Sequence, residues 1–180
     1  MYLKSVLFLP VLMLALLATA CGGGGDSGGG GSDEQQAGAA ANKDIKTFLG
    51  LFDGSTNSQQ LLNAFAPECR SGVSTSDIDK VAALIKAFAP DLSKAKVEDV
   101  DLGALTYETT SDGIKVTAKD PNATRIKTKG KWMSADDYFK LAGLDSSDTN
   151  VTSGEPTLMV KRNGAWYIGD CSILSDLSLN

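Results

Sequence analysis

The side chains in this sequence that could carry out acid–base chemistry are carboxylates and tyrosines, because the chain contains no histidine. This excludes serine–histidine–aspartate and cysteine–histidine nucleophile systems and every metal site that needs an imidazole ligand. Asp99 and Asp101 lie two positions apart in an expected strand, so both should face one side of a sheet. Tyr107, Tyr138 and Tyr167 are the donors that could assist them. Alternating acids on a surface strand are usually solvated, and we therefore predict no catalytic residue.

Carboxylates are also the candidate metal ligands. They occur as three close pairs: Asp99 with Asp101, Asp136 with Asp137, and Asp145 with Asp148. None of these pairs lies in the twelve-residue calcium-loop pattern of alternating ligands that ends in glutamate. The glycine tract of residues 22–31 lacks the strand before it and the helix after it that a phosphate-binding loop requires. The sequence predicts neither a metal site nor a cofactor.

The first twenty residues have the organisation of an export signal. A single cation, Lys4, precedes an apolar run from Val6 to Leu17, which is too short to span a bilayer but suits a signal-peptide core. The next residues, LATAC at 17–21, resemble the lipobox of bacterial lipoproteins, in which small residues precede the cysteine that receives the lipid. This resemblance implies cleavage before Cys21 and a membrane anchor there. An ordinary signal peptide, which would leave Cys21 as a free thiol, is the alternative.

A glycine-rich segment follows Cys21. Residues 22–32 read GGGGDSGGGGS, and residues 33–42 are polar or small, so this stretch has no large apolar side chain to bury. A glycine-rich coil of this length has an end-to-end distance of about 25 Å. We therefore expect residues 21–42 to be a lipidated cysteine and a flexible tether. The tether would hold one globular domain, residues 43–180, outside the cytoplasm.

The charge distribution argues against nucleic acid as a partner, because the chain has a net charge of −5. The densest cationic stretch contains Arg125, Lys127, Lys129 and Lys131. This alternation would place all four cations on one face of an extended strand. A solvated sheet face or a lysine-guarded edge explains the pattern, and an anionic ligand is the alternative.

The cysteine count predicts a disulfide. If the lipid occupies Cys21, then Cys69 and Cys171 remain as an even pair in an oxidising compartment. Their pairing would join the helical part of the domain to its last strand. It would also leave no thiolate for cysteine chemistry.

The period of apolar residues predicts helices first and strands afterwards. Helices are expected over Asp44–Phe52, over Ser58–Ala66, and from Ser76 or its neighbour to Pro90. The expected strands are Leu105–Thr109, Ile114–Ala118, Thr124–Trp132, Thr157–Lys161 and Ala165–Cys171, with an Asp-Gly turn after the first and an Asn-Gly turn before the last. Ser134 and Asp137 should begin one further helix, with Tyr138, Leu141 and Ala142 on its apolar face.

Helices followed by an antiparallel sheet predict an α+β domain. The order of the elements, the residues APEC at 66–69, the stretch 91–102 and the closing GAWYIGDC at 164–171 resemble small bacterial lipoproteins of the nuclear-transport-factor-2-like, or cystatin-like, superfamily. The resemblance implies N-terminal helices packed on a curved antiparallel sheet, in a cone-like fold around an apolar hollow. The candidate lining residues of that hollow are Phe48, Leu84, Val116 and Trp166.

We therefore expect a membrane-anchored, non-catalytic domain that binds a small apolar ligand or another envelope component, such as a protein. A structural or assembly protein of the cell envelope is the leading alternative. The third interpretation is a carboxylate- and tyrosine-dependent enzyme, like the isomerases that share this type of fold.

Overall fold

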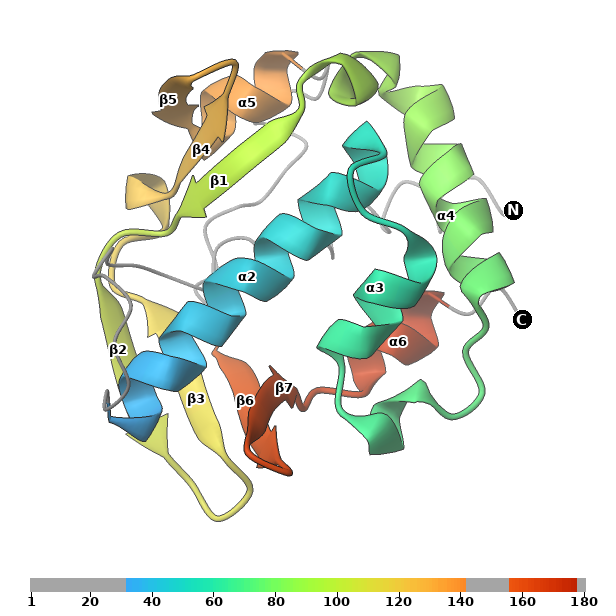
Figure 1. The fold of residues 1–180 in the computed structure, drawn as a ribbon. Helices are drawn as coiled ribbons and strands as arrows, with labels where there is room; N and C mark the ends of the chain where they lie inside the picture. Colours follow the sequence, from blue (N-terminus) through green and yellow to red (C-terminus); the bar gives the residue numbers. More distant parts are fainter. Residues whose placement is uncertain (1–31, 142–155, 178–180) are drawn as a thin grey trace, which may run out of the picture.

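Residues 32–141 and 156–177 are described by the structure, a computed structural model in which helices pack with two antiparallel sheets (Figure 1). The helices are α2 (Asp33–Asp53), α3 (Ser58–Ala64), α4 (Thr75–Phe88), α5 (Ala135–Leu141) and α6 (Ser172–Leu177). The strands are β1 (Val97–Asp101), β2 (Leu105–Thr109), β3 (Ile114–Ala118), β4 (Arg125–Thr128), β5 (Lys131–Ser134), β6 (Thr157–Arg162) and β7 (Ala165–Ile168). The α+β class is confirmed. The strands form two sheets instead of one, in the orders β1-β4-β5 and β2-β3-β6-β7.

Helix α2 begins at Asp33, well before the predicted start at Asp44. The hydroxyl of Ser32 caps it by accepting a hydrogen bond from the N–H of Gln35 at 3.4 Å. The assignment of residues 33–42 to the tether is therefore wrong. The small residues of this stretch let the helix lie close to the sheet, because a Cβ on Gly38 would come within 2.6 Å of the Leu105 and Tyr107 side chains. The predicted signal peptide, Cys21 and the first part of the tether lie outside the described residues.

The next two helices follow their capping signals closely. Asn57 and Gln60 cap α3, which ends two residues earlier than predicted. The reason is that Phe65 is extended and forms an isolated parallel bridge with Ile168 of β7. Ser74 and Asp77 form the capping box of α4, so this helix begins slightly before the predicted Ser76.

The strand predicted over Thr124–Trp132 is two strands joined by a turn. Lys129 and Gly130 have positive φ angles of 50° and 74°, which fold the chain back so that β4 pairs with β5. The four cations from Arg125 to Lys131 therefore do not share one strand face, and that prediction is wrong. Thr124, Ile126 and Thr128 point inward and are buried.

The end of the chain contains the predicted hairpin and one unpredicted helix. Asn163 and Gly164 adopt positive φ angles of 53° and 81° between β6 and β7. Strand β7 ends at Ile168 and not at Cys171, since Ser172 begins α6. Ser134 caps α5 as predicted, by accepting a hydrogen bond from the N–H of Asp137 at 3.1 Å. Tyr138 on this helix is buried, Leu141 is exposed, and Ala142 lies outside the described residues.

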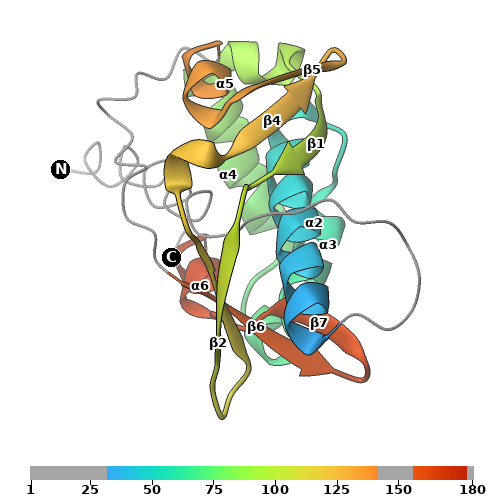
Figure 2. The same ribbon diagram turned by 90° about the vertical axis from the view of Figure 1, so that its left-hand side faces the viewer.

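The core lies between the helices and the two sheets. Helix α2 runs along both sheets and is covered on its other side by α3 and α4 (Figures 1 and 2). The largest fully buried side chains of the core include Leu49, Leu61, Phe65, Tyr138 and Met159. Within the described part of the chain, no helix is both long enough and apolar enough to cross a membrane.

Candidate binding site

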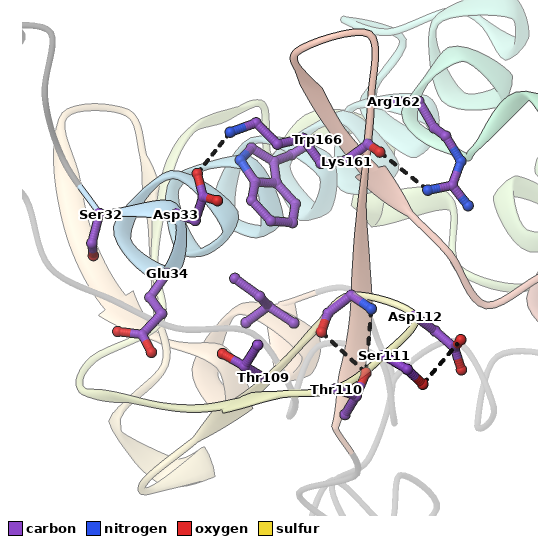
Figure 3. Close-up of a pocket in the computed structure, with 12 residues that line it drawn as sticks. Ser32, Asp33, Glu34, Thr109, Thr110, Ser111, Asp112, Lys161, Arg162 and Trp166 are labelled. Atoms are coloured by element: carbon purple, nitrogen blue, oxygen red, sulfur yellow. Dashed lines mark hydrogen bonds and ion pairs between the residues drawn. The ribbon is translucent and has the colours of Figure 1, made fainter.

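An open pocket of about 600 Å³ lies at the N-terminal end of α2 (Figure 3). Three segments that are distant in sequence form it: the first turn of α2, the loop between β2 and β3, and the β6–β7 hairpin. The lining residues are Ser32, Asp33, Glu34, Thr109, Thr110, Ser111, Asp112, Gly113, Ile114, Lys161, Arg162 and Trp166. Most of these side chains are polar or charged, and the pocket is open to solvent.

Trp166 supplies the aromatic surface of this pocket. The ammonium group of Lys161, its partner across the hairpin, lies 5.4 Å from the centre of the indole ring. The same ammonium group forms an ion pair with Asp33 at 2.7 Å, so one cation connects the helix to the hairpin (Figure 3). The indole Nε1 is buried and has no hydrogen-bond partner among the residues that the structure describes. An unpartnered buried donor is uncommon in folded proteins and costs about 1–3 kcal/mol.

The loop between β2 and β3 forms a firm hydroxyl-bearing wall of the pocket. The Thr110 hydroxyl donates to the Gly113 carbonyl oxygen at 3.0 Å and accepts from the Gly113 N–H at 3.2 Å. Gly113 lies so close to β6 that a Cβ there would overlap the Met159 carbonyl oxygen. The Ser111 hydroxyl donates to Oδ1 of Asp112 at 3.3 Å, and both side chains line the pocket, where they can exchange hydrogen bonds with a bound molecule.

A second charged contact fixes the β6–β7 hairpin. The guanidinium of Arg162 donates to Oε1 of Glu68 through Nε at 2.9 Å and through Nη2 at 2.5 Å. A hydrogen bond from the Glu68 backbone N–H, followed by the one from Arg162, lowers the pKa of the Glu68 carboxyl. Ion pairs of exposed side chains thus flank the pocket, at Lys161 and at Arg162.

The structure does not bring the four predicted lining residues together at this pocket. Of these four, only Trp166 lines it. Phe48 packs edge-on against Phe52 in α2, with ring centres 5.0 Å apart. Val116 is fully buried in β3, whereas Leu84 on α4 is 37% exposed.

The acids and tyrosines considered for catalysis are also dispersed. Asp99 and Asp101 share the outer face of β1, as predicted, and each Oδ1 accepts a backbone N–H at 3.0 Å. The Tyr138 hydroxyl is buried and donates to the Ala95 carbonyl oxygen at 3.3 Å. Burial, with a smaller contribution from the negative charge of Asp53, raises the pKa of Tyr138. The guanidinium carbon of Arg70 lies over the Tyr167 ring, 5.6 Å from the ring centre. Tyr107 packs against α2 near Gly38.

The candidate metal pairs are similarly separated. Asp136 and Asp137 lie in the first turn of α5, where Asp137 accepts a hydrogen bond from the Ser134 hydroxyl at 2.8 Å. Asp145 and Asp148 lie outside the described residues. No group of three or more carboxylates or cysteines within residues 32–141 and 156–177 is placed to hold a metal ion.

Sequence reasoning missed one ionisable residue, Asp44. The sequence predicts a helix start at this residue, but it lies in the middle of α2 and is only 7% exposed. Within residues 32–141 and 156–177, its Oδ2 has no hydrogen-bond partner. Burial raises the pKa of its carboxyl to about 8, although the nearby Lys43 charge lowers it in part. The signal was the spacing Ala37, Ala41, Asp44, Phe48, Leu51, which continues a buried helical stripe through the acid.

The two remaining cysteines lie together as predicted. The sulfur atoms of Cys69 and Cys171 are 1.96 Å apart, at the distance of a disulfide bond, and the Cα atoms are 4.7 Å apart. The pair joins the 3₁₀ turn Pro67–Arg70 to the segment before α6. It is placed beside the Phe65–Ile168 bridge.

Comparisons of the chain with protein families, with curated proteins and with solved structures find no match. The superfamily resemblance therefore stays a prediction. The fold and the site define an α+β domain with an open, polar, tryptophan-bearing pocket at one end.

Proposed function

We propose that this domain binds a hydroxyl-rich component of the cell envelope, such as a glycan, in the pocket beside Trp166. The supporting observation is the combination of an indole with threonine, serine and carboxylate side chains around an open hollow. The C–H faces of a sugar can pack on an aromatic ring, and its hydroxyls can exchange hydrogen bonds with the surrounding polar groups. An open pocket also admits one residue of a longer polymer.

A polar ligand suits this lining better than a small apolar one. An apolar molecule would remove Asp33, Glu34 and Asp112 from water without giving them hydrogen bonds, which is unfavourable. A glycan would replace the lost water contacts with its own hydroxyls. We infer a binding role without catalysis, in which the chain is exported and held at the membrane through a lipid on Cys21.

Replacing Trp166 by alanine tests the pocket. Peptidoglycan fragments titrated into the full chain should change tryptophan emission, and Trp166→Ala should weaken binding measured by calorimetry at least tenfold, which corresponds to about 1.4 kcal/mol. Trp132→Ala, which changes a tryptophan outside the pocket, is the matched control and should bind normally. If fatty acids or isoprenoids bind in a Trp166-dependent way and no glycan does, the apolar ligand is correct instead.

Replacing Cys21 by serine tests the anchor. The variant lacks the thiol that would carry the lipid, and it should move from membranes to the aqueous phase of a detergent separation. Stable anchoring needs more than one acyl chain, so the effect should be nearly complete. Ser27→Ala, in the same glycine tract, should leave the partition unchanged. A parent chain that enters the aqueous phase as fully as Cys21→Ser contradicts the proposal.

A further inference from the structure

The β4–β5 hairpin presents a tryptophan between two cations. Lys127 pairs with Trp132 and Arg125 pairs with Ser134, so Arg125, Lys127 and Trp132 share the outer face of the sheet. The Arg125 guanidinium carbon lies 6.0 Å from the centre of the Trp132 ring, and the Lys127 ammonium nitrogen lies 5.9 Å from it. Trp132 is 38% exposed, which is unusual for a large side chain on a sheet. We call these three residues the Trp132 face.

Two acids lie next to the cations of the Trp132 face and offset part of their charge. Asp99 and Asp101 on β1 stand directly opposite Lys127 and Arg125. Each acid, however, turns Oδ1 to a backbone N–H, that of Val100 or Gly103. No ion pair joins Arg125 or Lys127 to an acid within the residues that the structure describes. Both cations lean toward the indole and remain available to an outside anion.

The tip of the hairpin adds two more exposed cations, Lys129 in the turn and Lys131 at the start of β5. Glu98 places one negative charge at the tip, where both of its carboxylate oxygens accept the Gly130 N–H at 3.1 Å. The hairpin segment 125–134 thus carries four cations and no acid, in a chain whose net charge is −5. Arg125 and Lys127 lie beside the indole, whereas Lys131 pairs with the buried Thr128 and extends from the other face of the sheet. Figure 2 shows this sheet with α2 and α4 behind it, so the outer face is turned away from these two helices.

We propose that the Trp132 face and the hairpin tip dock on an anionic lipid bilayer. An indole with one apolar and one polar edge settles at the headgroup level of a membrane, and lysine and arginine stems extend their charges to the phosphates. A cluster of cations beside such a residue is attracted to anionic lipid. An exposed indole flanked by two cations matches the headgroup level of a bilayer, where apolar and anionic groups lie side by side, and this favours a membrane over a protein segment.

Docking would leave the pocket open. The pocket lies at the N-terminal end of α2, whereas the sheet that carries the Trp132 face joins the other end, where Asp53 accepts the Val97 N–H at 2.6 Å (Figure 1). A helix of 21 residues separates the two by about 30 Å. This inference rests on the proposed anchor only in that the anchor keeps the domain near the bilayer. Docking of the Trp132 face would add a second, weaker attachment to the membrane.

The test uses the full chain with Trp166→Phe, which leaves Trp132 as its single tryptophan, reconstituted in phosphatidylcholine vesicles with or without phosphatidylglycerol. Flotation in a density gradient reports anchoring, and quenching of Trp132 by brominated lipid reports docking. We expect quenching and a blue-shifted emission in the anionic vesicles alone. About 0.5 M salt should reverse both, because charges are then screened within a few ångströms.

Two double variants distinguish an effect of the cations on the Trp132 face from an effect of the total charge of the chain. Arg125→Gln with Lys127→Gln should lower quenching to the level of neutral vesicles. Lys80→Gln with Lys86→Gln on α4 makes the same charge change elsewhere and should quench like the parent. Circular dichroism of each variant should match the parent.

The outcomes distinguish the anchor from the docking. A chain that floats with both vesicles while Trp132 stays unquenched overturns the docking and leaves the anchor standing. A chain that floats with anionic vesicles alone supports the docking without the anchor. Emission that responds to a soluble anionic polysaccharide and not to anionic vesicles overturns lipid as the partner.

Discussion

Asp44→Asn is expected to stabilise the domain at pH 7 by on the order of 4 kcal/mol and to leave its stability almost unchanged near pH 3. The reason is the burial of this carboxyl inside α2, which raises its pKa from 3.8 to about 8 in the folded chain. Above pH 4 the unfolded chain releases the Asp44 proton and is stabilised by ionisation. The folded chain keeps this proton up to about pH 8 and is not stabilised in that way, so the free energy of unfolding is lowered. Asparagine has nearly the same shape and cannot ionise in either state.

The direction of the pH dependence follows from proton counting. Between pH 4 and pH 8 the folded chain binds one more proton at Asp44 than the unfolded chain, so the free energy of unfolding falls as the pH rises through this window. Glu68 and Asp77 have the opposite shift. Hydrogen bonds, first from Ser74 in the case of Asp77, lower the pKa of these carboxyls, so their effect is confined to acid pH. The chain has no histidine to add a titration near neutrality.

Urea unfolding of the parent and of Asp44→Asn at intervals from pH 3 to pH 9 measures this difference. The two curves of stability against pH should diverge from about pH 4 upward and run parallel again above pH 8. Glu34→Gln, in the exposed first turn of the same helix, is the matched control, and it should follow the parent closely. Curves for the parent and Asp44→Asn that stay parallel from pH 4 to pH 8 would show that this carboxyl ionises freely in the folded state.

Local signals were the predictable part of this fold. Ser134 with Asp137 and Asn163 with Gly164 act within a few residues of each other, so their spacing was sufficient to place a helix start and a hairpin turn. The strand pair β2–β3 was predictable for the same reason. The disulfide pair needed only the cysteine count and the expectation that the chain is exported.

Features that depend on distant partners were missed. The segment 33–42 reads as a linker because it lacks large side chains, yet its small residues are what allow close contact with Leu105 and Tyr107. The β4–β5 turn was missed because the alternation of cations continues across Lys129 and Gly130. The pocket joins residues near 33, 110 and 165 through the pairing of β3 with β6, which no spacing in the sequence reveals.

Removing the Cys69–Cys171 pair should lower the stability of the domain by about 2–4 kcal/mol without changing the fold. The cross-link closes a loop of 102 positions, and the chain-entropy model gives up to about 4.7 kcal/mol for a loop of roughly that length. The same junction is also held by a backbone hydrogen bond, in which the Ala66 N–H donates to the Ile168 carbonyl oxygen at 2.9 Å. Cys69→Ala with Cys171→Ala should therefore unfold at lower urea concentration while its circular dichroism remains that of the parent.

The cross-link itself is best examined in the Cys21→Ser chain, since Cys69 and Cys171 are then its only cysteines. After denaturation without a reductant this chain should expose no reactive thiol, and after reduction it should expose two. Two thiols before reduction would show that the pair is not oxidised in the purified protein. Because Cys171 is exposed and Cys69 is buried, reduction of the folded chain should begin at the outer sulfur. If the bond acts mainly by restricting the unfolded chain, reduction of the parent and the double alanine substitution should lower the free energy of unfolding by the same amount. A larger decrease in the double alanine variant would measure the packing of the Cys69 sulfur in the core.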